Sequence, residues 1–221
     1  MALTQRSPHA VTRALLARHG RTFAEELRID LAPDDPAGLY RLLAFAILAG
    51  MKLHHRIALD AADALRKAGW TTPDAMLAAD FDRRVRLLNR AGCARCDQRV
   101  AQALHNASHA LLARHHGSLA QLHHDSAGDR ERTRSQLAAL PGLTDAAVDI
   151  FCREAQLVWD ELYPFADRPA LRGAAWLGLP TDAPGLAALA RDRQQTVRLI
   201  TALVRMELEY DIEEIRRAVT P

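Results

Sequence analysis

The fold of this chain is decided by residues 137–179, which read LAALPGLTDAAVDIFCREAQLVWDELYPFADRPALRGAAWLGL. A Leu-Pro-Gly turn at 140–142 separates two helical patterns, and a single aspartate, Asp167, comes before a third. The turn lets backbone N–H groups face outward at the start of the next helix, where the helix dipole also favours an anion. Pro169 follows Asp167 by two residues, and proline is preferred in the first turn of a helix. The stretch therefore combines a turn suited to binding a phosphate with a carboxylate at a helix start.

Composition and periodicity predict an all-α fold. Hydrophobic residues make up 49% of the 221 residues and are mostly Ala and Leu, whereas aromatic residues make up 5%. This balance favours helices, and no stretch alternates apolar and polar residues as a strand does. A chain of this length buries a substantial core and fits one domain or two small lobes.

Capping residues and glycines set the expected helix limits. Helices are expected at residues 8–19, 37–49, 53–68, 73–79, 82–91, 96–115, 118–124, 129–139, 144–162, 169–176, 184–191 and 194–210, with a connector at 21–35 and a short piece from 211.

The sequence predicts neither a membrane span nor a secretory signal. The longest apolar run, at residues 42–51, has about ten residues, whereas a spanning helix needs about 20. Residues 1–20 carry charges throughout and lack the apolar centre of a signal peptide. A cytoplasmic location is therefore expected.

The positive charge of the chain is concentrated in one segment. The formal net charge is +2, which is too mild to predict nucleic-acid binding by itself. Between residues 82 and 99 there are six arginines and only two acids, Asp82 and Asp97. The arginines are Arg83, Arg84, Arg86, Arg90, Arg95 and Arg99. A positive surface for DNA phosphates and an ordinary solvated helix face are equally consistent with this run.

The hairpin and the aspartate that follows it resemble those of the helix-hairpin-helix DNA glycosylases, in the endonuclease III-like branch. The resemblance runs from about residue 11 to residue 204, and its motif positions are 140–142, Asp167, Arg172 and Leu179. In that family the hairpin usually reads Leu-Pro-Gly-Val-Gly-x-Lys-Thr-Ala. Here residues 140–148 read Leu-Pro-Gly-Leu-Thr-Asp-Ala-Ala-Val, so Thr144 replaces the second glycine and Ala146 replaces the lysine.

The resemblance implies a monofunctional DNA glycosylase of base-excision repair. Asp167 would be its catalytic residue, stabilising a sugar cation and orienting water as the N-glycosidic bond of a damaged base breaks. The base must first leave the stack. The family's lysine attacks the sugar in members that also cleave the strand, so Ala146 implies no lyase activity. Arg172 is expected to pair with an acid, and the sequence does not identify the damaged base.

Two alternatives stay open. The first is a catalytically silent relative that would use the same lobes to bind DNA or a protein. Thr144, Asp145 and Ala146 favour this hypothesis. A helical regulatory domain that merely shares the turn would have Asp167 buried and facing the core. In either case Asp167 would act only as the N-cap of its helix, the commoner role for such a residue.

The resemblance also implies the residues that contact double-stranded, damaged DNA. Residues 51–56 lie where relatives place the side chains that fill the gap left by an extruded base, and Gly50 stands where they usually have glutamine. A plain turn between helices is the alternative for this segment. The candidate DNA-binding residues are Gly142, Leu143, Thr144, Met51, Lys52, His54, Arg95 and Arg99.

Two lobes are implied in the same way. Residues 36–130 would form a six-helix lobe, and residues 1–35 with 131–221 would form a second lobe that contains the hairpin. In the resembled fold the substrate cleft lies between the lobes. The residues alone predict one helical domain, and they say nothing of oligomeric state.

The cysteines argue against a bound cluster. Cys93, Cys96 and Cys152 suit reduced thiols, and no cysteine follows Cys152. Many endonuclease III relatives bind a four-cysteine iron–sulfur cluster after the last helices, and this chain lacks the ligands for one. A zinc site at Cys96 and His105 is disfavoured, because one helix would hold them roughly 13 Å apart. We expect no cofactor and no metal.

Overall fold

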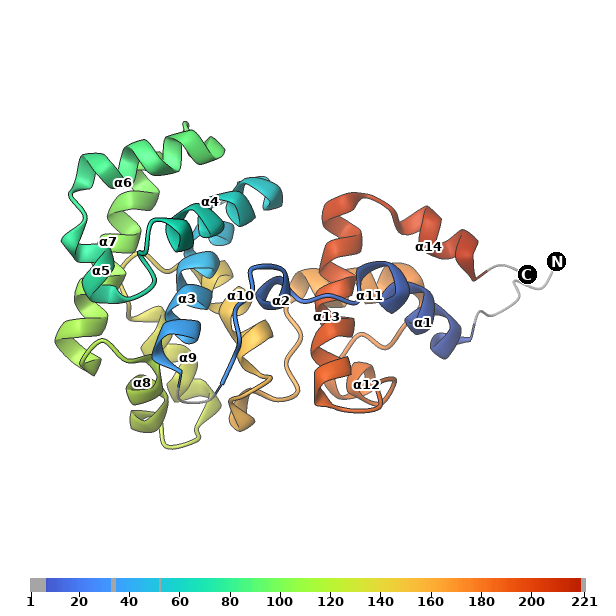
Figure 1. Ribbon diagram of the computed structural model, residues 1–221. Helices are drawn as coiled ribbons and strands as arrows, with labels where there is room; N and C mark the ends of the chain where they lie inside the picture. The colour runs from blue at the N-terminus through green and yellow to red at the C-terminus, as the bar shows by residue number, and fades with distance from the viewer. Residues whose placement is uncertain (1–6, 33–34, 52, 220–221) are drawn as a thin grey trace. The chain divides into compact units, whose positions relative to one another are not determined.

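The computed structural model describes residues 7–32, 35–51 and 53–219. Within these ranges every regular element is a helix and no strand occurs (Figure 1). The all-α prediction is therefore confirmed. None of the described helices combines the length and the apolar character needed to cross a membrane.

The chain divides into two compact units. Residues Met1–Glu26 and Tyr163–Pro221 form one, called the terminal unit, and Leu27–Leu162 form the other, called the middle unit. The division differs from the expected boundaries, because residues 27–35 and 131–162 belong to the middle unit. The cause is the packing of two helices. Helix α10 (Asp145–Ala155) lies against α3 (Pro36–Gly50), and α9 (Arg130–Ala138) lies against α8 (Leu119–Asp125) and α10. The hairpin is thus part of the middle unit.

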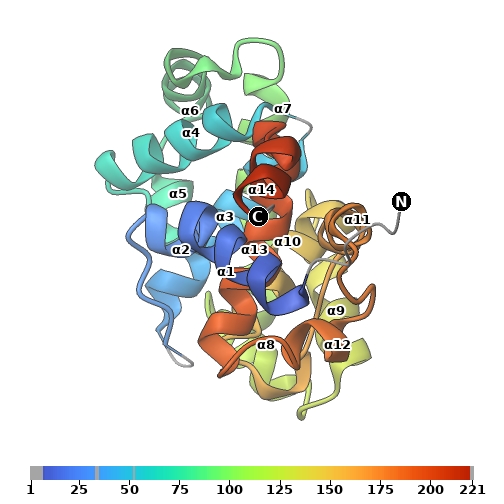
Figure 2. The ribbon, with the colours of Figure 1, turned by 90° about the vertical axis from the view of Figure 1, so that its right-hand side faces the viewer.

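The terminal unit is built around α13, which packs against α1, α11 and α12. Figure 2 shows α1 crossing α13. Gly173 allows α11 to approach α13 closely, because a Cβ at this position would lie 2.9 Å from the carbonyl oxygen of Leu203 on α13. The helices of this unit are α1 (Pro8–His19), α2 (Phe23–Glu26), α11 (Arg168–Leu177), α12 (Ala183–Ala187), α13 (Arg193–Glu209) and α14 (Ile212–Ala218).

A short helix, α2, interrupts the expected connector. The Thr22 hydroxyl accepts a hydrogen bond from the Glu25 N–H at 3.1 Å, and the Glu25 carboxylate accepts one from the Thr22 N–H at 2.9 Å. This reciprocal pair is a capping box, whose Thr-x-x-Glu signature is present in the sequence. Arg198 of α13 donates to the same carboxylate at 3.0 Å, and this contact holds α2 against the unit's central helix.

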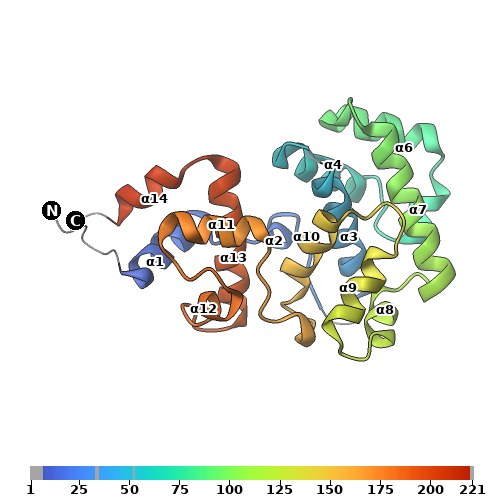
Figure 3. The ribbon, with the colours of Figure 1, turned by 180° about the vertical axis from the view of Figure 1, so that it is seen from behind.

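The middle unit surrounds α3, a helix buried on nearly all sides. Its apolar residues from Leu39 to Leu48 are almost inaccessible, as its continuous hydrophobicity predicts. Figure 3 shows α10 beside it. The helices of this unit are α3 (Pro36–Gly50), α4 (His55–Lys67), α5 (Pro73–Ala78), α6 (Phe81–Leu88), the π turn η1 (Asn89–Cys93), α7 (Asp97–His115), α8 (Leu119–Asp125), α9 (Arg130–Ala138), α10 (Asp145–Ala155) and the 3-10 turn η2 (Asp160–Leu162).

The helix expected at residues 144–162 ends early, at Ala155. The N–H groups of Val158 and Trp159 both donate to the Ala155 carbonyl, at 2.9 Å each, which tightens the chain into a turn. This turn places the Trp159 indole in the core, where it stacks on His123 with 4.5 Å between ring centroids. Burial of the largest side chain in the segment therefore overrides helix propensity.

Candidate nucleic-acid interface

The turn between α9 and α10 depends on a glycine at position 142. The Leu143 N–H donates to the Leu140 carbonyl at 3.2 Å, and the buried Leu140 side chain anchors the turn in the core. Gly142 has φ +97°, which L side chains rarely adopt. A Cβ there would also lie 2.8 Å from the Cα and the carbonyl oxygen of Ala103 on α7. The turn thus packs directly against the α7 backbone.

The start of α10 exposes backbone donors. Thr144 caps the helix: its hydroxyl accepts from the Ala147 N–H at 3.2 Å. The N–H groups of Gly142, Thr144, Asp145 and Ala146 have no hydrogen-bond acceptor among the described residues. Residues 144–146 are exposed to solvent. Free N–H groups at a helix N-terminus favour an anion, both as donors and through the helix dipole.

Two of these four residues, Gly142 and Thr144, line an open pocket of about 650 Å³, here called the hairpin pocket. It brings together the end of α3, one face of α7 and the turn before α10, segments that lie far apart in the sequence. Its lining residues are Gly50, Met51, Arg99, Gln102, Ala103, Asn106, Gly142, Leu143 and Thr144. Five of the candidate DNA-binding residues are therefore in one place, and the two amide side chains, which the sequence did not single out, join them.

The structure explains why glycine occupies position 50, where the resembled family usually has glutamine. A Cβ at Gly50 would lie 2.9 Å from the Thr144 hydroxyl and 2.9 Å from the Ala147 Cβ. The end of α3 therefore fits against the first turn of α10 only when residue 50 has no side chain. Met51, the next residue, lines the pocket instead.

Of the remaining candidates, His54 and Arg95 do not line the pocket. His54 caps α4, where its Nδ1 accepts from the Arg56 N–H at 3.4 Å. Arg95 is exposed in the turn between η1 and α7. Lys52 lies outside the described residues.

Not all of the arginines between residues 82 and 99 lie on the surface. Arg84 is buried, with 3% of its area exposed, and donates to the Met76 carbonyl at 3.0 Å and to the Ala79 carbonyl. Burial lowers its pKa, because desolvation disfavours the charged form. Arg84 therefore ties the end of α5 to α6 and does not belong to a DNA-binding surface. The exposed members are Arg83, Arg86, Arg90, Arg95 and Arg99.

Asp167 is the N-cap of α11 and is buried, with 4% of its area exposed. Its Oδ1 accepts a hydrogen bond from the Ala170 N–H at 3.3 Å. Arg172 pairs with Glu207, with 3.1 Å between Nε and Oε1, so its structural role is confirmed. A buried Asp167 is what one alternative, a helical regulatory domain that merely shares the turn, predicts. The capping hydrogen bond holds one carboxylate oxygen in place.

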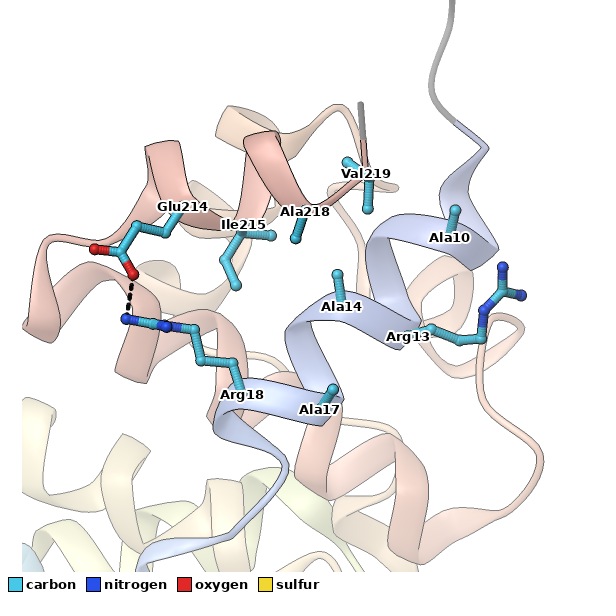
Figure 4. Close-up of a pocket in the computed structure, with 9 residues that line it drawn as sticks. All are labelled: Ala10, Arg13, Ala14, Ala17, Arg18, Glu214, Ile215, Ala218 and Val219. Carbon is cyan, nitrogen blue, oxygen red and sulfur yellow. Dashed lines mark ion pairs between the residues drawn. The ribbon is translucent and has the colours of Figure 1, made fainter. Parts of the chain in front are cut away.

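The terminal unit has a groove of its own between α1 and α14 (Figure 4). Small side chains of α1 face Ile215 across it, and the ion pair between Arg18 and Glu214 closes one end. None of the candidate site residues lines this groove.

The three cysteines are buried. Burial raises the pKa of the Cys93 thiol to about 11 and that of Cys152 to about 12, because it disfavours the thiolate. In the parts of the chain that the structure describes, no three His, Cys, Asp or Glu side chains are grouped so that they could hold a metal ion.

The raised pKa values predict slow alkylation of the native protein. At pH 7.5 the thiolate fraction of Cys93 is expected to be about 100-fold below that of an ordinary thiol, and only the thiolate reacts. Mass spectrometry after timed treatment with iodoacetamide, with and without guanidinium chloride, measures this. Equal rates in the native and the unfolded protein would contradict the assigned burial.

Comparison with models of known protein families found no match, and comparison with curated protein sequences found none.

Proposed function

We propose that this protein binds double-stranded DNA through the hairpin pocket. The backbone N–H groups of Gly142 and residues 144–146 would hold a backbone phosphate, and Arg99 would supply a positive charge beside it. The observation that carries the proposal is that Gly142 and Thr144, at the start of α10, line one open pocket together with Arg99 and Met51. Phosphate contacts supply most of the affinity of a nonspecific DNA-binding protein.

The charges near the pocket set the expected strength of this binding. Asp145 is exposed in the first turn of α10 and opposes an incoming phosphate. Arg99 lines the pocket. Four more exposed arginines lie on α6, on η1 and in the turn after η1, in the same unit. Binding is therefore expected to depend on these arginines and to weaken steeply as salt rises.

The proposed activity is hydrolysis of the N-glycosidic bond of a damaged base, with Asp167 as the catalytic carboxylate. The cap hydrogen bond from Ala170 fixes the carboxylate at the start of α11, and its negative charge would stabilise a developing sugar cation and orient water. Ala146 provides no amine for a covalent imine. The expected product is thus an abasic site in an unbroken strand.

A specific observation favours a second candidate, a catalytically silent DNA-binding protein. Asp167 is 4% exposed, and a carboxylate must reach both water and substrate to act. Thr144 and Ala146 depart from the hairpin of the resembled glycosylases, and Asp145 adds a negative charge beside the turn. This candidate keeps the hairpin pocket as the DNA-binding site and assigns Asp167 to capping alone.

Incubation with a panel of duplexes separates the two candidates. Each duplex carries one damaged base, and alkali after the incubation cleaves any abasic site. Strand cleavage after alkali with any duplex supports the glycosylase. Binding to the panel without cleavage supports the silent protein, and failure to bind any duplex at low salt contradicts both.

Arg99→Ala is expected to weaken binding to all duplexes alike, by about threefold to tenfold, the scale of one exposed charge-assisted contact. It should also lower the slope of log affinity against log salt by about 1, because one fewer counterion is released. Fluorescence anisotropy titrations over a range of salt concentrations measure both quantities. The control is Arg191→Ala, an exposed arginine of the terminal unit, which should change neither. An unchanged salt slope for Arg99→Ala would remove this residue from the interface.

Treatment with borohydride during incubation with damaged DNA is expected to trap no protein–DNA adduct. Trapping requires an imine between an amine and the sugar, and Ala146 stands where the resembled family has its lysine. Denaturing gel electrophoresis detects such an adduct as a band of lower mobility. Its appearance would show that another amine forms the imine.

A further inference from the structure

Two amide side chains lie side by side on the face of α7 that lines the hairpin pocket. Gln102 and Asn106 are one helical turn apart, and the Gln102 Nε2 donates to the Asn106 Oδ1 at 2.7 Å. Gln102 is exposed and Asn106 is half-buried. The hydrogen bond orders two side chains that solvent would otherwise leave mobile.

This hydrogen bond leaves a complementary pair of groups uncommitted. A side-chain amide has one carbonyl oxygen and two N–H donors. The Gln102 Oε1 and the Asn106 Nδ2 have no hydrogen-bond partner among the described residues. The pair therefore has an uncommitted carbonyl oxygen on Gln102 and an uncommitted NH₂ group on Asn106, two residues that line the pocket.

The amide pair adjoins the elements that hold the phosphate in the proposed function. Arg99 precedes Gln102 by three residues on the same face of α7. Ala103, next to Gln102, supplies the backbone against which Gly142 packs. A strand whose phosphate lies on the turn would bring the edge of a neighbouring base pair to the amides.

We propose that Gln102 and Asn106 contact the edge of one base pair next to the phosphate held by the hairpin, an inference that rests on the proposed function. In the major groove, an A·T pair offers the adenine N6 donor beside the N7 acceptor, and a G·C pair offers the cytosine N4 donor beside the guanine O6 acceptor. In the minor groove, only a G·C pair offers a donor, the guanine N2 amine. The amides therefore add a preference for base composition to binding that phosphate contacts dominate.

Competition among matched duplexes tests the proposal. Four duplexes of equal length contain only A·T pairs, only G·C pairs, I·C pairs in place of G·C, or 7-deazaadenine in place of adenine. Inosine lacks the guanine N2 amine, and 7-deazaadenine lacks N7. The native protein is expected to prefer either A·T or G·C by about fivefold or more, the lower end of what a bidentate contact contributes. A preference for A·T should be lost with 7-deazaadenine. A preference for G·C should be lost with I·C if the amides contact the minor groove and kept with I·C if they contact the major groove.

The double variant Gln102→Ala with Asn106→Ala is expected to bind all four duplexes with the affinity of the native protein for its weaker natural duplex. Gln98→Ala is the matched control, since Gln98 is an exposed amide on α7 that does not line the pocket. Circular dichroism establishes that each variant is folded.

The outcomes separate this inference from the proposed function. Equal native affinities for the four duplexes would overturn the inference and leave DNA binding in place. The same would follow if the double variant weakened all four duplexes by one factor, because the amides would then contact only the backbone. Failure of every duplex to bind at low salt would overturn the proposed function and the inference together.

Discussion

Asp167→Asn is expected to lower the rate of base excision by roughly 100-fold or more, the usual scale for a positioned acid–base group. Asparagine keeps the side-chain oxygen that caps α11 but carries no negative charge to stabilise a sugar cation. Asparagine and aspartate are equally good N-caps, so the fold and the affinity for DNA should not change. Single-turnover excision and equilibrium binding, measured on the same duplex, distinguish the two effects.

Asp182→Asn provides the matched control for this prediction. Asp182 caps α12 in the same unit, where its Oδ1 accepts from the Gly185 N–H at 2.8 Å. This substitution changes charge and cap in the same way at an exposed site, and excision should proceed at the native rate. Full excision by Asp167→Asn would remove Asp167 from the mechanism and leave it the capping role that its burial suits.

Gly142→Ala is expected to destabilise the protein by about 2–5 kcal/mol. A positive φ costs an L-residue about 1–2 kcal/mol. The new Cβ would also lie 2.8 Å from backbone atoms of Ala103, and relieving such overpacking costs about 1–3 kcal/mol. Urea unfolding followed by circular dichroism measures the loss.

Gly128→Ala separates the two contributions. Gly128 belongs to the same unit and has φ +71°, but a Cβ there would meet no atom within 4 Å. This variant should show only the backbone cost, about 1–2 kcal/mol. If both variants lose the same stability, the close approach of the turn to α7 contributes nothing.

Much of the fold could be predicted because its signals are local. The helices α5, α8 and α9 begin directly after Thr72, Ser118 and Asp129, whose side chains accept hydrogen bonds from backbone N–H groups of the first turn. The early end of α10 is different, because it depends on where the Trp159 indole packs. A pattern of apolar residues cannot say which of them must leave a helix to reach the core.

In the candidate site too, features with a local sequence signal could be predicted, and features that depend on tertiary packing could not. The hairpin could be located because Pro141 and Gly142 mark a turn wherever they occur together. Arg84 was misassigned, although it shares a helix face with Leu88 four residues later, and both are buried. Gln102 and Asn106 lie about 40 residues before the hairpin in the sequence, and only the packing of the turn on α7 brings them to the pocket.

A ¹⁵N–¹H correlation spectrum recorded as duplex DNA is added tests directly whether the start of α10 holds a DNA phosphate. If the hairpin pocket holds a phosphate, the amide signals of Gly142, Thr144, Asp145 and Ala146 should shift together and saturate with the affinity found by anisotropy. The signals of Gly128 and Gly178, exposed glycines outside the pocket, should stay in place. Saturable binding that leaves the four hairpin amides unshifted would contradict the account.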